Sequence, residues 1–306
     1  MDKYCVFISV MHYDEYYSIN KWPQEGDKGV MTPKGAVPGG SVSNASTVFS
    51  AIGGNAYFYD VLSKSQSNDE LLDNLKKHGV NVDNVTRVDD LIDSKCLIIS
   101  GEEERTILVV LNPKPVTKLT DKQRTMFRNA GFIYGASGWQ YFIENVVEEF
   151  KDFKEHGAKI ALDCEIKFSD EKTKEVVESA SVLFFNEFGI EDNRGDMSED
   201  EYIQYLFSKG VENVVLTLGK EGCRVVSPNE DFRVKAYNVK PLDTNGAGDA
   251  FNSAYIYGLM NGWTKREAAE FATAAGGRAI LSIGAQGGAV SEEEIREFMR
   301  THKKYE

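Results

Sequence analysis

The chain has 306 residues, of which 42% are hydrophobic and 27% charged, a balance that predicts a sizeable core and not a disordered chain. Its 35 lysines and arginines against 48 aspartates and glutamates give a formal net charge of −13, which argues against nucleic acid or an anionic membrane as a partner of the whole surface. No apolar run approaches the roughly 18 residues that a membrane span requires. The opening "MDKYCVFISV" does not resemble a signal peptide, so we expect a cytoplasmic protein.

The N-terminal third begins with a strand-like run, "YCVFISV", at residues 4–10. A helix is expected near 44–52, a strand over 55–62 and an amphipathic helix over 68–79, which ends at a glycine. Short apolar runs that alternate with helices are typical of a sheet covered on both faces.

Two segments interrupt this alternation, at about 12–38 and 95–112. The second, "KCLIISGEEERTILVVL", has two short β runs around a polar turn, which is the pattern of a hairpin. Both segments could be surface loops with one hairpin. We interpret them as extra strands that lie off the main sheet and form a small lid.

From residue 130 the chain alternates regularly between strands and helices. Strands are expected at 130–136, 158–163, 181–186 and 211–219, with helices at 141–157, 170–180 and 198–210 between them. The last sixty residues are expected to be helical, at 250–262, 264–282 and 291–302. This order predicts an α/β fold with a mostly parallel central sheet.

The cysteines and histidines give no motif. Cys5, Cys96, Cys164 and Cys223 are far apart in the sequence and never form C-x-x-C, so buried reduced thiols are expected in place of disulfides or a zinc site. The four histidines show no H-E-x-x-H spacing, and none is expected to be catalytic.

The stretch "DTNGAGDAF" at residues 243–251 carries the strongest chemical signal. Its glycines permit a tight turn into a helix, whose first amides, at Gly246, Ala247 and Gly248, would point free N–H groups at an anion such as phosphate. Asp249 could simply complement the helix dipole. Beside an anion site that faces a cleft, it could also accept the proton of an alcohol during phosphoryl transfer.

Other phosphate-binding motifs are absent from the sequence. No G-x-x-x-x-G-K-[ST] occurs, and "GAGDAF" has too few glycines for the dinucleotide fingerprint and follows a polar run where that fingerprint needs a buried strand. A P-loop enzyme and a dehydrogenase are therefore not expected.

"PLDTNGAGDAF" resembles the D-T-x-G-A-G-D-x-F motif of the ribokinase-like carbohydrate kinases, the phosphofructokinase-B group. "PGGSVSNAS" at 38–46, "KWPQEGD" at 21–27 and "NVVLTLGKEG" at 213–222 are similar to further family stretches, so the resemblance spans nearly the whole chain. It implies a ribokinase-like three-layer α/β/α sandwich with a small β-sheet lid, as a single domain over 1–306. Details of "GGSVSNASTVFSAIGG" and "ERTILV" look nearer to ketohexokinase and sulfofructose-kinase relatives than to ribokinase itself.

The resemblance also implies an activity, in which ATP gives its γ-phosphoryl group to a primary hydroxyl of a small sugar, either a fructose-like ketose or a ribose-like pentose. Asp249 would be the catalytic base beside the anion hole of Gly246, Ala247 and Gly248. The implied sugar ligands are Asp14, Gly40, Ser41 and Asn44. Ser41 stands where ketohexokinase-like relatives have asparagine, which leaves the identity of the sugar open.

The nucleotide side is implied in the same way. The contacts expected from the family pattern are Asn186, Thr217, Gly219, Gly222 and Thr273.

A magnesium ion is expected to neutralise the nucleotide phosphates. The family motif N-E-x-E is matched by Asn186 and Glu187, but Gly189 stands at the position of the second glutamate. Glu187 is the predicted metal ligand, with Asp163 and Glu165 as alternatives at the end of a strand.

Several alternatives stay open. Arg105 is either a solvated turn residue or a cation that closes onto a phosphate or an anionic sugar group, and Asp243 and Asn245 could hold a monovalent cation. The acceptor could be a nucleoside or a phosphorylated or sulfonated sugar, with Lys28 and Arg105 as the recognising cations. From a different class, the chain could be a non-catalytic sugar or nucleotide sensor. A β lid leaves open edges and apolar surface, so we expect a homodimer that forms through the lid.

Overall fold

The computed structural model describes residues 3–101, 105–110, 112–138, 142–168 and 170–306. The polar turn of the expected hairpin, at 102–104, lies outside the described residues, as do position 111 and the start of the helix expected from 141.

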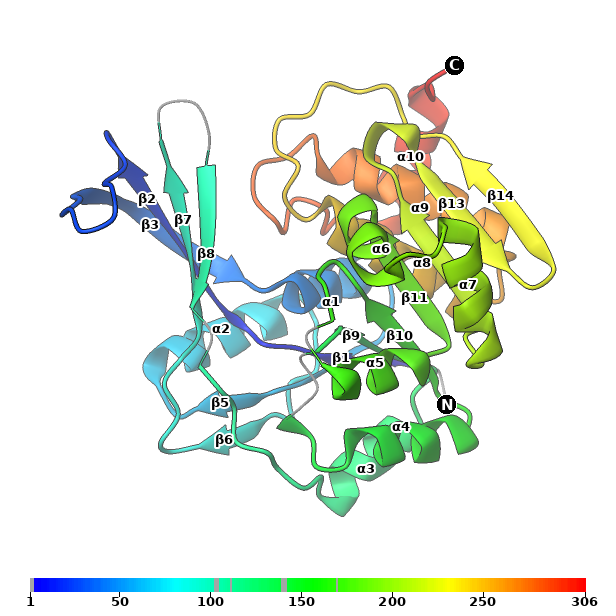
Figure 1. Cartoon of the computed structure of the whole chain (residues 1–306), viewed down its shortest axis with the longest axis horizontal. Coiled ribbons are helices and arrows are strands. Elements are labelled where there is room, and N and C mark those ends of the chain that lie inside the picture. The colour runs from blue at the N-terminus through cyan, green and yellow to red at the C-terminus, as the bar shows by residue number, and fades with distance from the viewer. Residues whose placement is uncertain (1–2, 102–104, 111, 139–141, 169) are drawn as a thin grey trace.

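A central sheet of eight strands runs through the body of the molecule (Figure 1). Its strands, in spatial order, are β14 (Glu230–Val234), β13 (Cys223–Ser227), β12 (Asn213–Thr217), β11 (Val182–Asn186), β10 (Lys159–Asp163), β9 (Phe132–Ala136), β1 (Cys5–Ile8) and β4 (Ala56–Tyr59). The six strands from β12 to β4 are parallel, and β13 and β14 form an antiparallel extension. Most of the parallel strands are short apolar runs buried on both faces, which is why the sequence shows continuous β runs without polar alternation.

Helices cover both faces of this sheet, each with a separate apolar core. On one face lie α1 (Ser41–Ala51), α2 (Gln66–Lys77), α8 (Ala247–Met260), α9 (Lys265–Ala279) and α10 (Glu292–Thr301). On the other lie α3 (Asp121–Arg128), α4 (Val146–Glu155), α5 (Glu171–Glu178), α6 (Glu187–Arg194) and α7 (Glu199–Ser208). The three-layer α/β/α sandwich expected from the sequence is confirmed.

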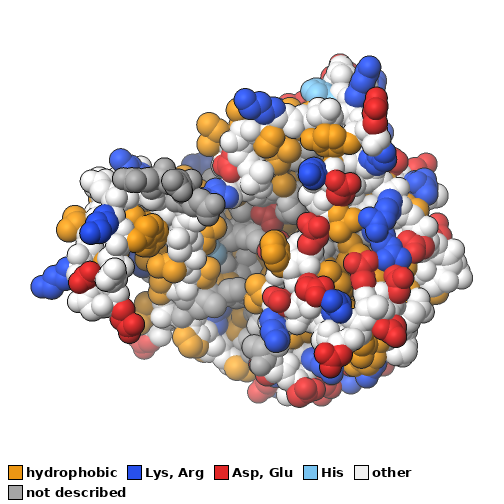
Figure 2. Space-filling view, turned by 45° about the horizontal axis from the view of Figure 1, so that its top comes forward, with side chains coloured by type: hydrophobic (Ala, Val, Ile, Leu, Met, Phe, Trp, Pro, Cys, Tyr) orange, Lys and Arg blue, Asp and Glu red, His pale blue; other side chains and the backbone are white. Residues whose placement is uncertain are grey.

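Four further strands form a separate sheet that projects from the body (Figure 1). Its order is β3 (Met31–Gly39), β2 (His12–Ile19), β7 (Lys95–Ser100) and β8 (Arg105–Val110). We call this sheet the lid, because it is built from the two segments that interrupt the βα alternation. In Figure 2 the lid stands apart from the larger body, with a hollow between them.

A buried ion pair joins the lid to the body. The Asp60 carboxylate, which follows β4, accepts hydrogen bonds from the Met11 amide (2.9 Å) and from the Lys114 ammonium. Met11 precedes the first lid strand and Lys114 follows the last, so one body residue contacts both ends of the lid. Burial raises the pKa of Asp60 even though Lys114 opposes the shift.

Two local features differ from the expected elements. The strand expected over 55–62 divides at Asp60 into β4 and β5 (Val61–Ser63), and β5 pairs with β6 (Thr86–Val88) in a small separate sheet. Helix α6 was not expected, because it begins directly after β11 without a loop.

Candidate active site

Several predicted polar residues lie at one edge of the central sheet. Asp163, Asn186 and Thr217 are the last residues of the neighbouring parallel strands β10, β11 and β12, and Asn186 pairs with Thr217 in the ladder. The carboxyl ends of parallel strands are where open α/β sheets bind ligands. At the carboxyl ends of its strands, the sheet thus brings together residues that are as much as about fifty positions apart in the sequence.

Two helix N-termini meet at this edge, and neither has a side-chain cap among the described residues. Gly246, with φ of 76°, precedes α8, and Gly40, with φ of 98°, precedes α1. A Cβ on Gly246 would lie 2.1 Å from the Ala285 carbonyl oxygen, so both its conformation and its surroundings require glycine. Uncapped helix amides with the positive end of the dipole behind them form a site for an anion.

Asp249 lies in the first turn of α8 and is 8% exposed. Its Oδ1 accepts a hydrogen bond from the Ser41 hydroxyl (2.7 Å), and its Oδ2 accepts one from the Asn44 amide (3.3 Å). Both donors come from the first turn of α1. The structure therefore brings the predicted base into direct contact with two of the predicted sugar ligands.

The pKa of Asp249 is raised to about 7. Burial is the main cause, the hydrogen bond from Ser41 opposes it, and the negative charges of Glu165 and Asp14 raise it further. A carboxylate with this pKa is suited to accept a proton near neutral pH.

A second buried carboxylate, Asp163, lies beside Asp249. Its Oδ2 accepts hydrogen bonds from the Tyr134 hydroxyl (3.2 Å) and the Asn252 amide (3.0 Å). Burial raises the pKa of Asp163, and the charges of Glu165 and Asp249 raise it further. Asp163 and Asp249 are therefore both buried, and Glu165 lies close enough for its charge to act on each of them.

Glu165 follows β10, is exposed as a residue and lines the pocket between the body and the lid. A Cβ on Gly248 would lie 3.7 Å from the Glu165 Oε1, so this carboxylate lies next to the predicted anion hole. Enough protein surrounds the group for burial to raise its pKa.

A pocket of about 160 Å³ opens between the body and the lid, and its wall includes Ser41, whose hydroxyl donates to Asp249. Its wall combines apolar groups with polar ones from both parts of the molecule. It is lined by Ile8, Ser9, Val10, His12, Gly40, Ser41, Val42, Val109, Ala136, Ser137, Asp163, Glu165 and Ile166. Two buried oxygens near this wall, Ser9 Oγ and Asn44 Oδ1, have no hydrogen-bond partner in the described part of the chain.

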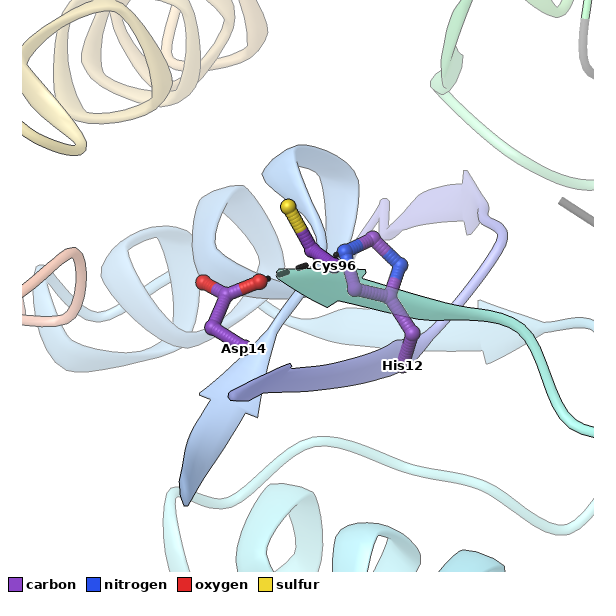
Figure 3. A group of neighbouring side chains, drawn as sticks. All are labelled: His12, Asp14 and Cys96. Atoms are coloured by element: carbon purple, nitrogen blue, oxygen red, sulfur yellow. Dashed lines mark ion pairs between the residues drawn. The ribbon is translucent and has the colours of Figure 1, made fainter. Parts of the chain in front are cut away.

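The lid contributes Asp14, from β2. Its Oδ1 lies 3.3 Å from Nε2 of His12, and both side chains are largely buried (Figure 3). A Cβ on Gly39 would lie 2.4 Å from the Asp14 carboxyl group, so glycine at this position leaves the space that the carboxylate occupies. Burial lowers the pKa of His12, but hydrogen bonds to Asp14 and Cys96 outweigh it and raise the pKa to about 9.

Arg105, at the start of β8, reaches from the lid to the loop that precedes α8. Its Nη2 donates to Asn245 Oδ1 (2.8 Å), and its Nη1 lies 3.9 Å from Asp243 Oδ1. The Asp243 carboxylate also accepts hydrogen bonds from the amides of Asn245 and Gly284, both at 3.0 Å. Arg105 therefore contacts the motif loop, where the sequence left open a solvated turn or a phosphate contact.

Two of the predicted nucleotide contacts lie in the turn between β12 and β13. Gly219 and Gly222 have positive φ values of 52° and 93° in the turn between β12 and β13. A Cβ on Gly222 would lie 1.9 Å from the Val234 carbonyl oxygen. Thr273 is buried in α9, where its hydroxyl donates to the Ala269 carbonyl (2.7 Å), so its contact with a nucleotide stays a prediction.

The departure from the N-E-x-E pattern has a steric reason. Asn186 caps α6, because its Oδ1 accepts a hydrogen bond from the Gly189 amide (2.7 Å). A Cβ on Gly189 would lie 1.9 Å from the Cys164 carbonyl oxygen, so no glutamate fits this position without a backbone shift. Glu187 is exposed in the first turn of α6.

Sequence reasoning missed four residues of this site: Gly39, His12, Tyr134 and Asn252. Asn252 and Asp249 are three apart on α8, so helical spacing could have indicated that they share a face. Tyr134 and Gly39 gave no such signal, because each acts on a residue from a distant strand or from the opposite side of a hairpin.

Comparisons with known proteins agree with this geometry. An uncapped glycine turn beside a buried carboxylate is an arrangement that phosphoryl transfer to an alcohol can use. The model of the pfkB family carbohydrate kinases matches residues 12–292, and the chain belongs to this family. It is therefore an enzyme of the carbohydrate-kinase class.

Individual relatives cover nearly the whole chain. The ribokinase of Bacillus subtilis is 24% identical over 303 residues, which cover 98% of this chain and all of that protein. The probable fructokinase-5 of Arabidopsis thaliana is 23% identical over 293 residues, 87% of this chain and 89% of that protein. The structure of Arabidopsis thaliana ribokinase complexed with ribose and ATP superposes with a TM-score of 0.84 at 20% identity, covering 98% of this chain and 99% of that one. No helix in the described ranges is both long and apolar enough to cross a membrane.

Proposed function

We propose that this kinase transfers the γ-phosphoryl group of ATP to a primary hydroxyl of a small neutral sugar, a ketose or a pentose. The observation that carries the proposal is Asp249, a buried carboxylate with a pKa of about 7 beside the uncapped N-terminus of α8. A proton acceptor and an anion site in contact are what phosphoryl transfer to an alcohol requires.

In the proposed reaction, Asp14, Gly40, Ser41 and Asn44 hold the sugar with its primary hydroxyl toward Asp249. The hydroxyl proton passes to the Asp249 carboxylate as the sugar oxygen bonds to the γ-phosphorus, and the bond from that phosphorus to the ADP oxygen breaks. The amides of Gly246, Ala247 and Gly248 stabilise the negative charge on the transferred group. A related protein that is named ribokinase, and that was solved with ribose and ATP, supports this substrate class.

A magnesium ion would be held by carboxylates at the same edge of the sheet. Mg2+ prefers hard oxygen ligands and usually keeps several waters. Glu165 and Asp163 fit this requirement because they lie close to Gly248 and Asp249, and the sequence-predicted Glu187 would be a further ligand from α6. When bound, the ion neutralises phosphate charge.

The charges around the pocket favour a neutral sugar over a phosphorylated or sulfonated one. His12 is the one cationic side chain among the described residues that line the pocket, and it is paired with Asp14. Arg105 is hydrogen-bonded to Asn245, and Lys28 lies in a separate hollow near the end of the lid. An anionic sugar would therefore meet Asp163 and Glu165 without a free countercharge.

A nucleoside acceptor is the second candidate, because the family also contains a protein named aminoimidazole riboside kinase, which is 24% identical to this chain over 284 residues. A bound monovalent cation near Asp243 is less favoured, since the Arg105 guanidinium already supplies a positive charge there. A cytoplasmic location and a homodimer formed through the lid complete the proposal.

Replacement of Asp249 by asparagine tests the assignment. Asp249→Asn keeps the shape of the side chain but cannot accept the proton, so the rate of sugar phosphorylation should fall by roughly a hundredfold or more. A coupled assay with ribose, fructose, adenosine and fructose 6-phosphate measures that rate, and equilibrium titration measures ATP binding, which should persist. Turnover near that of the unmodified enzyme would exclude Asp249 as the base.

A further inference from the structure

Three side chains of different chemistry meet on the inner face of the lid. His12 and Asp14 are two residues apart on β2 and so point to the same face, and Cys96 is the direct partner of Asp14 on β7. One ligand atom from each, an imidazole nitrogen, a carboxylate oxygen and the thiol sulfur, lies within 4.8 Å of the other two. Figure 3 shows the three side chains turned toward one another.

The imidazole ring of His12 is oriented as in a metal ligand. Its Nδ1 lies 3.0 Å from the Val10 carbonyl oxygen, and because that oxygen can only accept, Nδ1 carries the hydrogen. Nε2 is directed at Asp14, 3.3 Å away, and it gives up its own proton when a metal binds there. Histidines that bind metals usually donate their other ring N–H to a carbonyl or a carboxylate, which fixes the tautomer.

We propose that His12, Asp14 and Cys96 form a binding site for a borderline-soft divalent cation of the zinc class. Nitrogen, oxygen and thiolate donors together suit Zn2+ or Co2+ and not Mg2+, which takes oxygen ligands. Three protein ligands leave a fourth position open, and His12 lines the pocket from which an ion or a water reaches the site.

This site uses an atom that the sugar needs, and this step rests on the proposed function. A metal-bound Asp14 carboxylate cannot also accept sugar hydroxyls, so a zinc-class ion should compete with the sugar and not with ATP. The ion and the sugar cannot bind the Asp14 carboxylate at the same time, and the ion is therefore an inhibitor of the kinase.

Metal binding is measured first, without sugar or nucleotide. The full chain is stripped with a chelator and titrated with ZnCl2 in a calorimeter and with CoCl2 in a spectrophotometer. We expect one ion per chain and a thiolate-to-cobalt charge-transfer band. Cys96→Ser and His12→Asn should each weaken binding by at least about tenfold, the lower end of what an altered metal ligand shell costs.

A matched control is available on the surface. His156 lies 3.7 Å from Asp152 on α4, a pair of the same two residue types without a cysteine beside them. His156→Asn should leave the affinity for zinc unchanged. The cobalt band is also measured on the unmodified chain, so the result does not depend on a variant that folds poorly. Absence of that band, or full affinity in Cys96→Ser, would overturn the proposal.

Competition is measured second, in the kinase assay with saturating Mg-ATP. Zinc should raise the apparent KM for the sugar and leave kcat unchanged, and Cys96→Ser should lose this sensitivity. If zinc binds with the cobalt band but leaves KM unchanged, the competition is wrong and Asp14 is not a sugar ligand. If the chain binds zinc but phosphorylates no sugar, the metal site stands and the proposed function fails.

Discussion

At the scale of single residues, the proposed function depends on Asp249, a carboxylate that is only partly ionised near neutral pH. Because burial raises the pKa of Asp249 from 3.8 to about 7, the folded chain binds a proton there that the unfolded chain does not bind at pH 5. This group therefore favours folding below about pH 4, and that contribution is lost as the pH rises toward 7. The deprotonated form of Asp249, which the proposed reaction needs, therefore makes the folded state less stable than the protonated form does.

The same shift predicts the dependence of rate on pH. The base must be deprotonated, so kcat/KM for the sugar should fall as the pH drops below about 7, by a factor approaching ten for each pH unit. A profile measured from pH 5 to 9 at fixed ionic strength checks this. A rate that stays constant down to pH 5 would contradict the assigned role.

Two substitutions should move that profile in opposite directions. Ser41→Ala removes a hydrogen bond that stabilises the Asp249 carboxylate, so the acid limb should shift to higher pH. Glu165→Gln removes a neighbouring negative charge, so the limb should shift to lower pH. Shifts of the same sign in both variants would show that the limb belongs to a different group.

A glycine that sequence reasoning did not select gives a third test at this scale. Gly39→Ala would place a Cβ 2.4 Å from the Asp14 carboxyl group and displace that group. The KM for the sugar should rise by up to about a hundredfold, the cost of misplacing a binding group by an ångström or so. ATP affinity should not change. Lys34→Ala, an exposed position on the same strand, is the control and should leave KM unaltered.

These residues also show what a sequence can reveal. Gly246 and Asp249 are neighbours in one motif, so spacing and helix physics indicated that they lie together at a helix N-terminus, whereas their roles as anion hole and base were implied by the family resemblance and stay a prediction. The cluster of His12, Asp14 and Cys96 was not predictable, because Cys96 joins it through strand pairing across more than eighty residues. Gly189 was recognised as a departure from a motif, but the Cys164 carbonyl that requires it became visible only in the fold.

At the scale of elements, the strands and helices of the βα region were predictable because each apolar run has a clear stop. Helix α6 was missed since its cap, Asn186, is also the last residue of β11, and no polar loop separates the two elements. The lid sheet was predicted from the two segments that interrupt the βα alternation. Its connection to the body through Asp60 and Lys114 was not predicted, because no local sequence pattern marks a buried ion pair.

The contact between β8 and the loop before α8 predicts a coupling between the lid and the anion hole. Arg105→Ala removes the hydrogen bond to Asn245 and the positive charge near Asp243. The KM for the sugar should rise about tenfold, in the range of a lost hydrogen bond to a charged group. The fraction of ATP hydrolysed without sugar phosphorylation should also rise, because a lid without this contact admits water.

The control for this change is Arg300→Ala, which removes an arginine from exposed ion pairs on α10. Such pairs contribute little to stability, so the coupling of ATP hydrolysis to sugar phosphorylation and the KM for the sugar should both be unchanged. Phosphate release and sugar phosphate formation are measured in the same reaction. Full coupling in Arg105→Ala would show that the lid closes without this contact.

At the scale of the whole molecule, the body presents a mixed, net acidic surface while the lid leaves apolar groups uncovered (Figure 2). Four consecutive residues of the edge strand β8 are at least 38% exposed: Ile107, Leu108, Val109 and Val110. Val109 lines the pocket, whereas Leu108 pairs with Leu97 and points to the opposite face of the lid. An open, apolar edge strand favours pairing with a second chain.

Leu108→Asp therefore tests the proposed dimer without touching the pocket. A charge on the outer face of β8 would have to be buried at the interface, so this variant should be a monomer where the unmodified chain is a dimer. Light scattering coupled to size exclusion, over a range of concentrations, measures the mass. If the lid of one chain also shields the pocket of the other, the variant should show a raised KM for the sugar at low concentration. A monomeric mass for the unmodified chain at every concentration would exclude the dimer, and the exposed strand would then need another partner.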